Sequence, residues 1–325
     1  MLKIKNKHIV LSISLFVIGF IIIWGLLPES WLGTYSLHNV MEITNAFILD
    51  KFGWYYSLFL SAGLILVIYF IFSKYGSIKL GKNEDSPQFS YLAWLSMLFS
   101  AGMGIGLVFY GISEPLSHLH SPLVNGMTEN ESIQFAMTYS FFHWGLQPWA
   151  IYSIVALIIA YFTFRKGKSY LISSCVTPIF RTSSSSKTNN AVDIFAILAT
   201  VFGIIPSIGI GAQQISGGLS YLFPAISNTL SLQLTIIIVF TFLFLISAQT
   251  GLKRGIKYLS NINIVLAALM LLFVLIAGPT MFIMDFFTTI LGSYLQQLPQ
   301  LSLNLNPLKP EGAAYIQDWT IFYWG

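Results

Sequence analysis

Charged residues and cysteines are scarce in this sequence. Only 9% of its 325 residues are charged, whereas soluble domains carry about 25%. This scarcity excludes a water-soluble globular protein. Cys175 is the only cysteine, which excludes a disulfide framework and a cysteine-based metal site. The net charge of +4 does not indicate nucleic-acid binding, because the basic residues lie between apolar runs and form no basic stretch.

Long apolar runs dominate the chain and predict an all-α integral membrane protein. Runs of about 18 or more residues without charge are long enough to cross a bilayer as helices. We expect helices over 8–27, 54–73, 91–112, 132–164, 193–216, 231–250 and 257–278, and the start of an eighth near Trp319. The segment 278–298 has apolar residues at helical spacing with polar residues between them. It predicts an amphipathic helix at the outer interface, or else a short apolar loop.

The distribution of basic residues tests this helix count. If the N-terminus is cytoplasmic, only Lys51 and Lys309 of the 16 basic residues fall on the outer side. Cytoplasmic enrichment of Lys and Arg is the pattern that membrane insertion produces. We therefore expect a multi-pass protein of the cell membrane, surrounded by lipid, with its N-terminus in the cytoplasm.

The stretch "AGMGIGLVFYG", 101–111, places several glycines within one expected membrane helix. Gly102 and Gly106 have the spacing of close helix packing. Gly104 lies about 200° around the helix from Gly102, so one packing seam does not account for it. Glycines on opposite faces suit a backbone that leaves helical geometry, as substrate and cation sites of transporters do. From spacing alone, binding and packing both stay open. A nucleotide-binding loop is excluded, because there is no G-x-G-x-x-G and no strand.

The next helix carries aromatic residues near its middle. On an ideal helix Trp144, Tyr152 and Trp149 fall at about 0°, 80° and 140°, within one wedge. Ring faces beside an irregular backbone suit a quaternary ammonium group. His143 is expected to be packed or hydrogen-bonded and not a proton carrier. The loop histidines of "HLH", 118–120, are not taken as a metal site. The cores of the third to seventh helices have no acidic or basic residue, which favours coupling to Na⁺ over H⁺.

Four motifs together resemble the betaine/carnitine/choline transporter family. They are "AGMGIGLVFYGISEP", "FFHWGLQPWAIY", "LATVFGIIPSIGIGAQQI" and "DWTIFYWG". The resemblance implies a LeuT-type fold with two peripheral helices and two inverted five-helix repeats, the first of them over helices three to seven. It also implies sodium-coupled transport of glycine betaine, choline, carnitine or a related compound, no other cofactor, and homotrimers of the full-length carrier.

The resemblance assigns site residues by motif. Substrate would contact the aromatic residues Trp144, Trp149, Tyr152 and Phe322 and the glycine stretch at Gly102, Gly104 and Gly106. One sodium ion would bind carbonyl groups of Ser100 and Met103, and a second would lie near Thr200 and Ser207. Ile204 stands where sodium-coupled relatives offer a hydroxyl, which weakens the second sodium site. Proton-coupled choline carriers tend to have aspartate where this chain has Gly106.

The resemblance also divides the chain. Residues 1–90 would hold the peripheral helices, 91–278 the first repeat, 279–318 the outer helix and loop, and 319–325 the start of the eighth helix. On this basis we expect an N-terminal portion of a carrier, truncated after the first repeat and inactive alone. The alternative is a non-transporting membrane protein that associates with a full-length carrier. No catalytic pair is spaced as an enzyme requires, and no segment resembles a channel filter.

Overall fold

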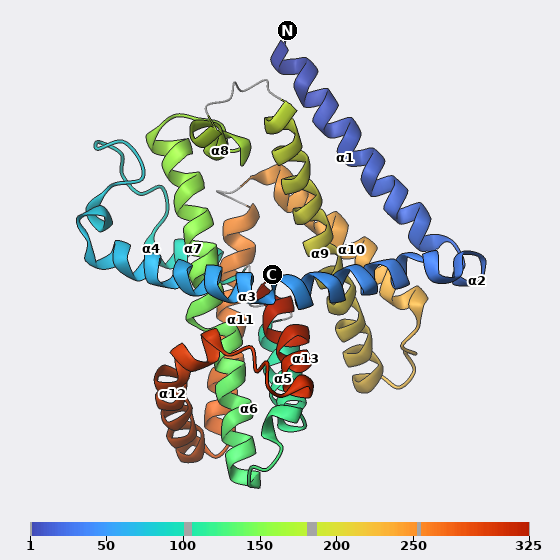
Figure 1. Cartoon of the computed structure of the whole chain (residues 1–325), viewed down its shortest axis with the longest axis vertical. Coiled ribbons are helices and arrows are strands. Elements are labelled where there is room, and N and C mark those ends of the chain that lie inside the picture. Colours follow the sequence, from blue (N-terminus) through green and yellow to red (C-terminus); the bar gives the residue numbers. More distant parts are fainter. Residues whose placement is uncertain (1, 101–105, 181–186, 252–254, 325) are drawn as a thin grey trace.

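The computed structural model describes residues 2–100, 106–180, 187–251 and 255–324, and within these ranges the chain is helical without strands (Figure 1). Six helical segments of the described ranges are long and apolar enough to cross a membrane. In none of them is more than 17% of the most apolar window buried, so broad apolar faces remain for lipid or other helices. The all-α membrane class predicted from the sequence is confirmed.

The N-terminal helices are longer than predicted. Helix α1 spans Leu2–Leu26, α2 spans Glu29–Leu32, and after a 3₁₀ turn α3 spans Leu37–Phe72. The predicted start at residue 54 is wrong, because the helix already begins behind Ser36, whose hydroxyl accepts a hydrogen bond from Asn39 N at 3.3 Å. Polar residues in the first turns of α3 lower the local hydropathy and hide this start from a search for apolar runs. In Figure 1, α3 runs crosswise to the upright helices of the molecule.

The helix predicted over 91–112 does not appear as one described helix. Helix α4 spans Tyr91–Ser100, a π-helix spans Gly106–Tyr110, and α5 spans Gly111–Leu119. The described part of α4 has 10 residues and reaches Ser100, and residues 101–105 lie outside the described ranges. The chain thus departs from α-helical geometry at Gly106–Tyr110, within the glycine stretch, and α5 runs on past the predicted end. Because His118 lies in α5, the prediction that it is a loop residue is wrong.

The single helix predicted over 132–164 is interrupted. Helix α6 spans Glu129–Trp144, α7 spans Leu146–Ala160, and a π-turn closes it over Tyr161–Arg165. The break is at Gly145, where a side chain would run into the Tyr294 hydroxyl and the Phe141 carbonyl. The Tyr294 hydroxyl accepts a hydrogen bond at 2.7 Å from Leu146 N, one of the amides that the break deprives of a helical partner.

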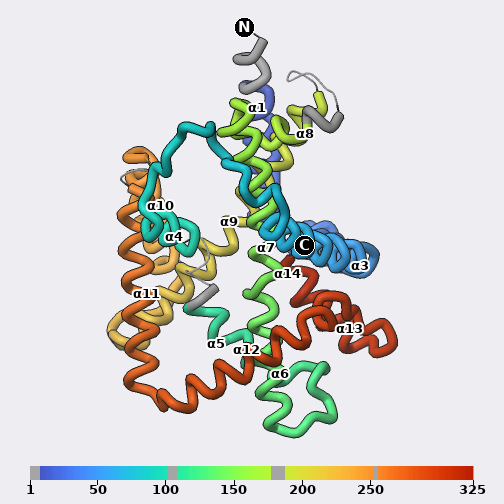
Figure 2. Tube along the Cα trace, turned by 90° about the vertical axis from the view of Figure 1, so that its left-hand side faces the viewer, coloured from blue at the N-terminus to red at the C-terminus, as the bar shows by residue number. Residues whose placement is uncertain are grey.

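The remaining membrane helices match the prediction or extend it. After α8, Ser173–Phe180, come α9 over Lys187–Leu222, α10 over Leu230–Thr250 and α11 over Lys257–Ala277. Helix α9 packs against α1 and α10, and α11 packs against α4. In Figure 2, α10 and α11 form one side of the molecule.

The C-terminal segment returns to α6 and α3. Helix α12 spans Thr280–Leu303, so the helix expected after residue 278 is confirmed and the loop alternative is wrong. In Figure 2 it runs from the lower end of α11 to α13, Pro310–Ile316. A π-helix over Gln317–Ile321 and α14, Phe322–Trp324, follow. Two apolar clusters anchor this segment. In one, Tyr294 packs against Tyr139 and Phe142 of α6. In the other, Ile316 and Ile321 pack against Leu49 of α3.

Candidate functional site

An open aromatic surface lies between α4 and α7. Trp149 and Tyr152 are one turn apart on α7, with ring centroids 5.9 Å apart. Phe99, next to the end of α4, approaches Trp149 with centroids 5.9 Å apart. Trp149 is 40% and Tyr152 69% exposed, so both rings keep free faces that a cation without acidic hydrogens can contact.

Trp144 belongs to a different aromatic group. Its ring centroid is 5.9 Å from that of Tyr110 and 5.9 Å from that of Tyr323 in α14. Tyr110 ends the π-helix that lies within the glycine stretch. The ideal-helix wedge of Trp144, Trp149 and Tyr152 is wrong as geometry, because the helix breaks at Gly145 between the first and the other two.

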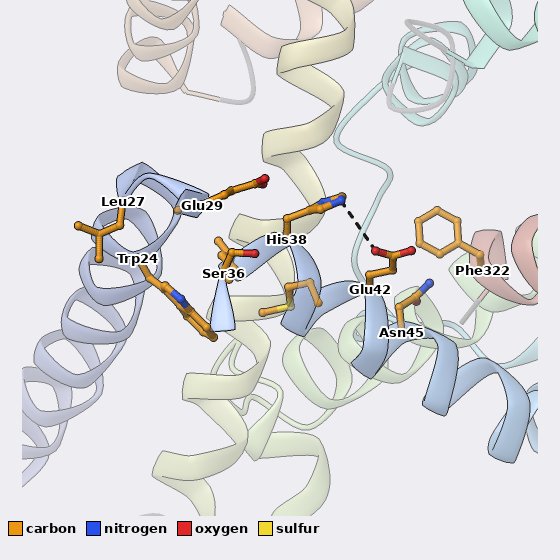
Figure 3. Close-up of a pocket in the computed structure, with 11 residues that line it drawn as sticks. Trp24, Leu27, Glu29, Ser36, His38, Glu42, Asn45 and Phe322 are labelled. Carbon is orange, nitrogen blue, oxygen red and sulfur yellow. Dashed lines mark ion pairs between the residues drawn. The ribbon is translucent and has the colours of Figure 1, made fainter. Parts of the chain in front are cut away.

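The other substrate residues predicted from the resemblance are three glycines and Phe322. Gly102 and Gly104 lie outside the described residues, and Gly106 begins the π-helix. Phe322 does not join the Trp149 surface in any described ring contact. It lines a cavity of about 650 Å³ with Trp24 of α1 and with Glu29, His38 and Glu42 (Figure 3). His38 Nε2 and Glu42 Oε2 are 3.8 Å apart at its rim.

The described sodium ligands of the prediction, Ser100, Thr200 and Ser207, are on two separate helices. Ser100 is the last residue of α4, and its hydroxyl donates a hydrogen bond to the Ser260 carbonyl of α11 at 3.3 Å. Met103 lies outside the described residues. Thr200 and Ser207 are on α9, where the Thr200 hydroxyl donates to the Ala196 carbonyl at 2.7 Å. Their roles stay predictions.

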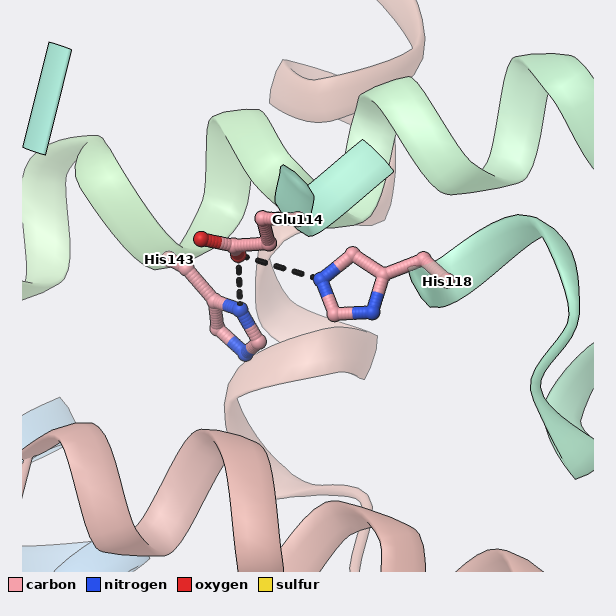
Figure 4. Close-up of side chains that lie close together, drawn as sticks. All are labelled: Glu114, His118 and His143. Atoms are coloured by element: carbon pink, nitrogen blue, oxygen red, sulfur yellow. Dashed lines mark hydrogen bonds and ion pairs between the residues drawn. The ribbon is translucent and has the colours of Figure 1, made fainter. Parts of the chain in front are cut away.

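A buried polar cluster that the sequence did not reveal lies beside Trp144. Its members are Glu114 and His118 of α5 and His143 of α6, which are 0%, 0% and 2% exposed (Figure 4). Glu114 Oε1 is 3.0 Å from His118 Nε2 and 2.5 Å from His143 Nδ1. Trp144 Nε1 donates to Glu114 Oε2 at 2.6 Å. The prediction that His143 is hydrogen-bonded is confirmed.

One sequence signal for this cluster exists. Glu114 and His118 are four residues apart, which places them on one face of a helix. The signal was missed because Glu114 falls just past the predicted end of the third helix. The third member, His143, comes from another helix, and no spacing rule along the chain links it to the other two.

The pattern of the BCCT family, the betaine/carnitine/choline family transporters, matches residues 9–325. The chain is 49% identical to the glycine betaine transporter OpuD of Bacillus subtilis over 98% of its own length and 62% of that protein. It is 40% identical to an ectoine/hydroxyectoine transporter of Virgibacillus pantothenticus, over 97% of this chain and 61% of that one.

A more distant relative is the osmo-independent choline transporter BetT1 of Acinetobacter baylyi, 37% identical over 97% of this chain and 58% of that protein. The chain therefore spans about three fifths of the length of these relatives. All three are named as transporters, and none as an enzyme.

Proposed function

Since the chain belongs to the betaine/carnitine/choline transporter family, we propose that it serves sodium-coupled uptake of a quaternary-ammonium osmolyte. Glycine betaine is the first candidate, because the relative at 49% identity is named a glycine betaine transporter; choline and carnitine follow. The observation that carries this proposal is the pair of half-open rings of Trp149 and Tyr152 beside the end of α4. A trimethylammonium group has no hydrogen to donate, and aromatic faces bind it through their negative potential.

Sodium coupling has separate support. A glycine-rich backbone that leaves helical geometry offers free carbonyl groups, and Ser100 and Met103 lie at such a stretch of the sequence. Oxygen ligands of this kind, with hydroxyl groups such as those of Thr200 and Ser207, suit a hard monovalent cation and need no acidic side chain. Ser100 and Met103 are the proposed ligands of one ion, and Thr200 and Ser207 lie near the second.

The proposal also covers the setting of the protein. The apolar helices make it a multi-pass membrane protein. We place it in the cell membrane with the N-terminus in the cytoplasm, because 14 of the 16 basic residues then lie inside. Homotrimers of the full-length carrier and the LeuT-type repeat arrangement are part of the same proposal.

Uptake and binding should be measured separately. Uptake of labelled glycine betaine is followed in transport-deficient cells that express the chain, in sodium and in potassium buffer. Binding is followed by tryptophan fluorescence of the purified chain in micelles, with glycine betaine, choline and carnitine. Trp149→Ala is the test variant. Trp31→Ala is its control, because Trp31 of α2 is 76% exposed and has no proposed role.

Each outcome decides one part of the proposal. Binding lost in Trp149→Ala and kept in Trp31→Ala supports the substrate site. Uptake that is equal in potassium overturns sodium coupling. Binding without uptake supports the substrate but shows that these 325 residues need further chain to transport. If no compound binds, and the chain lowers uptake by a co-expressed full-length relative, the non-transporting alternative is correct.

A further inference from the structure

The cluster of Glu114, His118 and His143 brings three metal-ligand atoms together. One potential ligand atom from each of the three residues lies within 4.8 Å of the other two, and Glu114 Oε1 contacts both His118 Nε2 and His143 Nδ1. In Figure 4 the carboxylate lies between the two imidazole rings, and both rings turn a nitrogen toward it. Two histidines and one carboxylate are a common set of protein ligands for zinc.

The second polar atom of each of these three side chains also makes a hydrogen bond. His118 Nδ1 is 2.7 Å from the Tyr315 hydroxyl, and His143 Nε2 is 2.8 Å from the Thr320 hydroxyl. The second carboxylate oxygen of Glu114 accepts the Trp144 indole N–H. In metal sites the ligating side chains are oriented by such hydrogen bonds on their far atoms. In this cluster each of the three potential ligands makes such an orienting hydrogen bond.

The hydroxyl groups of Tyr315 and Thr320 can pair with the two histidines whether or not a metal ion is bound. Without metal, each ring donates its inner N–H to Glu114 Oε1, and its outer nitrogen accepts from a hydroxyl. With metal, the inner nitrogens need free lone pairs, so each ring carries its proton on the outer nitrogen instead. Tyr315 and Thr320 then accept where they had donated, since a hydroxyl group does both. The rings stay neutral in both states.

Charge favours a cation at this position. Glu114 is fully buried, and within the described residues no Lys or Arg nitrogen lies within 4.0 Å of its carboxylate. A buried carboxylate whose partners are neutral is costly. A divalent cation would compensate the negative charge of the Glu114 carboxylate, and all three side chains would bind it.

We propose that Glu114 Oε1, His118 Nε2 and His143 Nδ1 bind one divalent first-row transition-metal ion, with Zn²⁺ as the reference ion. Tetrahedral zinc with bonds of about 2.0–2.1 Å separates its ligand atoms by roughly 3.3 Å. The two separations from Glu114 Oε1, 2.5 and 3.0 Å, are shorter than this value by less than 1 Å, so the ligands would move apart slightly to admit the ion. The ion would tie α5, which follows the glycine stretch, to α6 one residue before Trp144, and through Tyr315 and Thr320 to the C-terminal segment.

The test uses the purified 325-residue chain in micelles. The chain is loaded with ZnCl₂ and desalted, and bound zinc is measured by mass spectrometry. We expect about one zinc ion per chain, held by the three side chains with a water molecule in the fourth position, and loss of that ion in His118→Gln and in His143→Gln. The matched control is His120→Gln, because His120 is exposed, follows directly after α5 and lies outside the cluster.

Two further measurements do not depend on removal of a ligand. Tyr315→Phe keeps all three ligands but removes the hydroxyl behind His118, and it should weaken zinc binding about 10- to 100-fold. Loading the unaltered chain with Co²⁺ should give the visible absorption of a tetrahedral site. No retained zinc in a helical, folded chain, or equal zinc in His118→Gln and His120→Gln, would overturn the proposal and leave the cluster as a hydrogen-bond network only.

Discussion

The indole N–H of Trp144 donates its hydrogen bond to Glu114 Oε2 at 2.6 Å. This contact links the last residue of α6 to the helix that follows the glycine stretch. The carboxylate also accepts from the buried rings of His118 and His143, so two buried donors and the part-exposed indole depend on one side chain.

Glu114→Ala should therefore destabilise the fold. Each buried donor left without an acceptor costs about 1–3 kcal/mol, and the fluorescence of Trp144 should change with its new surroundings. Thermal unfolding in micelles measures the loss. Glu311→Ala is the control, since Glu311 is an exposed residue of α13. An equal unfolding temperature for both variants would contradict the prediction.

Gly145→Ala should destabilise the break between α6 and α7. The new methyl group meets the Tyr294 hydroxyl and the Phe141 carbonyl, and overpacking of this kind costs about 1–3 kcal/mol. Gly203→Ala in α9 is the matched control, because nothing lies within 4 Å of its added atom. There alanine should stabilise by about 0.5–1 kcal/mol. Chemical denaturation of both variants gives the comparison, and opposite signs are expected.

Ser302→Ala should loosen α12 from α7. The Ser302 hydroxyl accepts a hydrogen bond from Gln147 Nε2 at 2.5 Å, and Gln147 is 1% exposed. Loss of the acceptor leaves a buried amide donor unpaired, at a cost of about 1–3 kcal/mol. Ser231→Ala, on the exposed start of α10, should change the unfolding temperature little. Protease cleavage after residue 303 should also become faster in Ser302→Ala, and unchanged cleavage would count against this contact.

Thr128→Ala should weaken the start of α6. Thr128 and Glu131 form a reciprocal capping box, in which Thr128 N donates to Glu131 Oε2 at 2.8 Å. Loss of such a cap costs about 1 kcal/mol. Hydrogen exchange of the amides in the first turn should rise several-fold. Thr44→Ala serves as the control, because the Thr44 hydroxyl bonds only to a carbonyl within α3.

Cys175 should react slowly with maleimides. Burial raises the pKa of its thiol above the ordinary value, and only the thiolate attacks. A raised pKa leaves less thiolate at neutral pH, so the rate should begin to rise at higher pH than for a free thiol. Labelling of the native and the denatured chain over a pH series measures this. If the native chain were labelled as fast as the denatured chain, the thiol would be accessible to the reagent and the prediction would be wrong.

The sequence was sufficient for the membrane class, because apolar length alone determines it. It also located α10 and α11, which are apolar to both ends. It failed at the start of α3, where the first turns are polar, and at Gly145, where Tyr294 from a distant helix accepts the hydrogen bond of the Leu146 amide. The buried cluster could not be predicted for the same reason: His143 meets Glu114 only through packing of α5 on α6.

The interruption at Gly145 has a consequence for biosynthesis. Helix α6 has 16 residues and α7 has 15, or about 24 Å and 22 Å, so neither spans a bilayer core of about 30 Å. Together they lie within one apolar stretch, Glu129–Arg165. The insertion machinery therefore receives from the ribosome one apolar segment that is long enough to span the bilayer, although it consists of two helices that are each too short to do so.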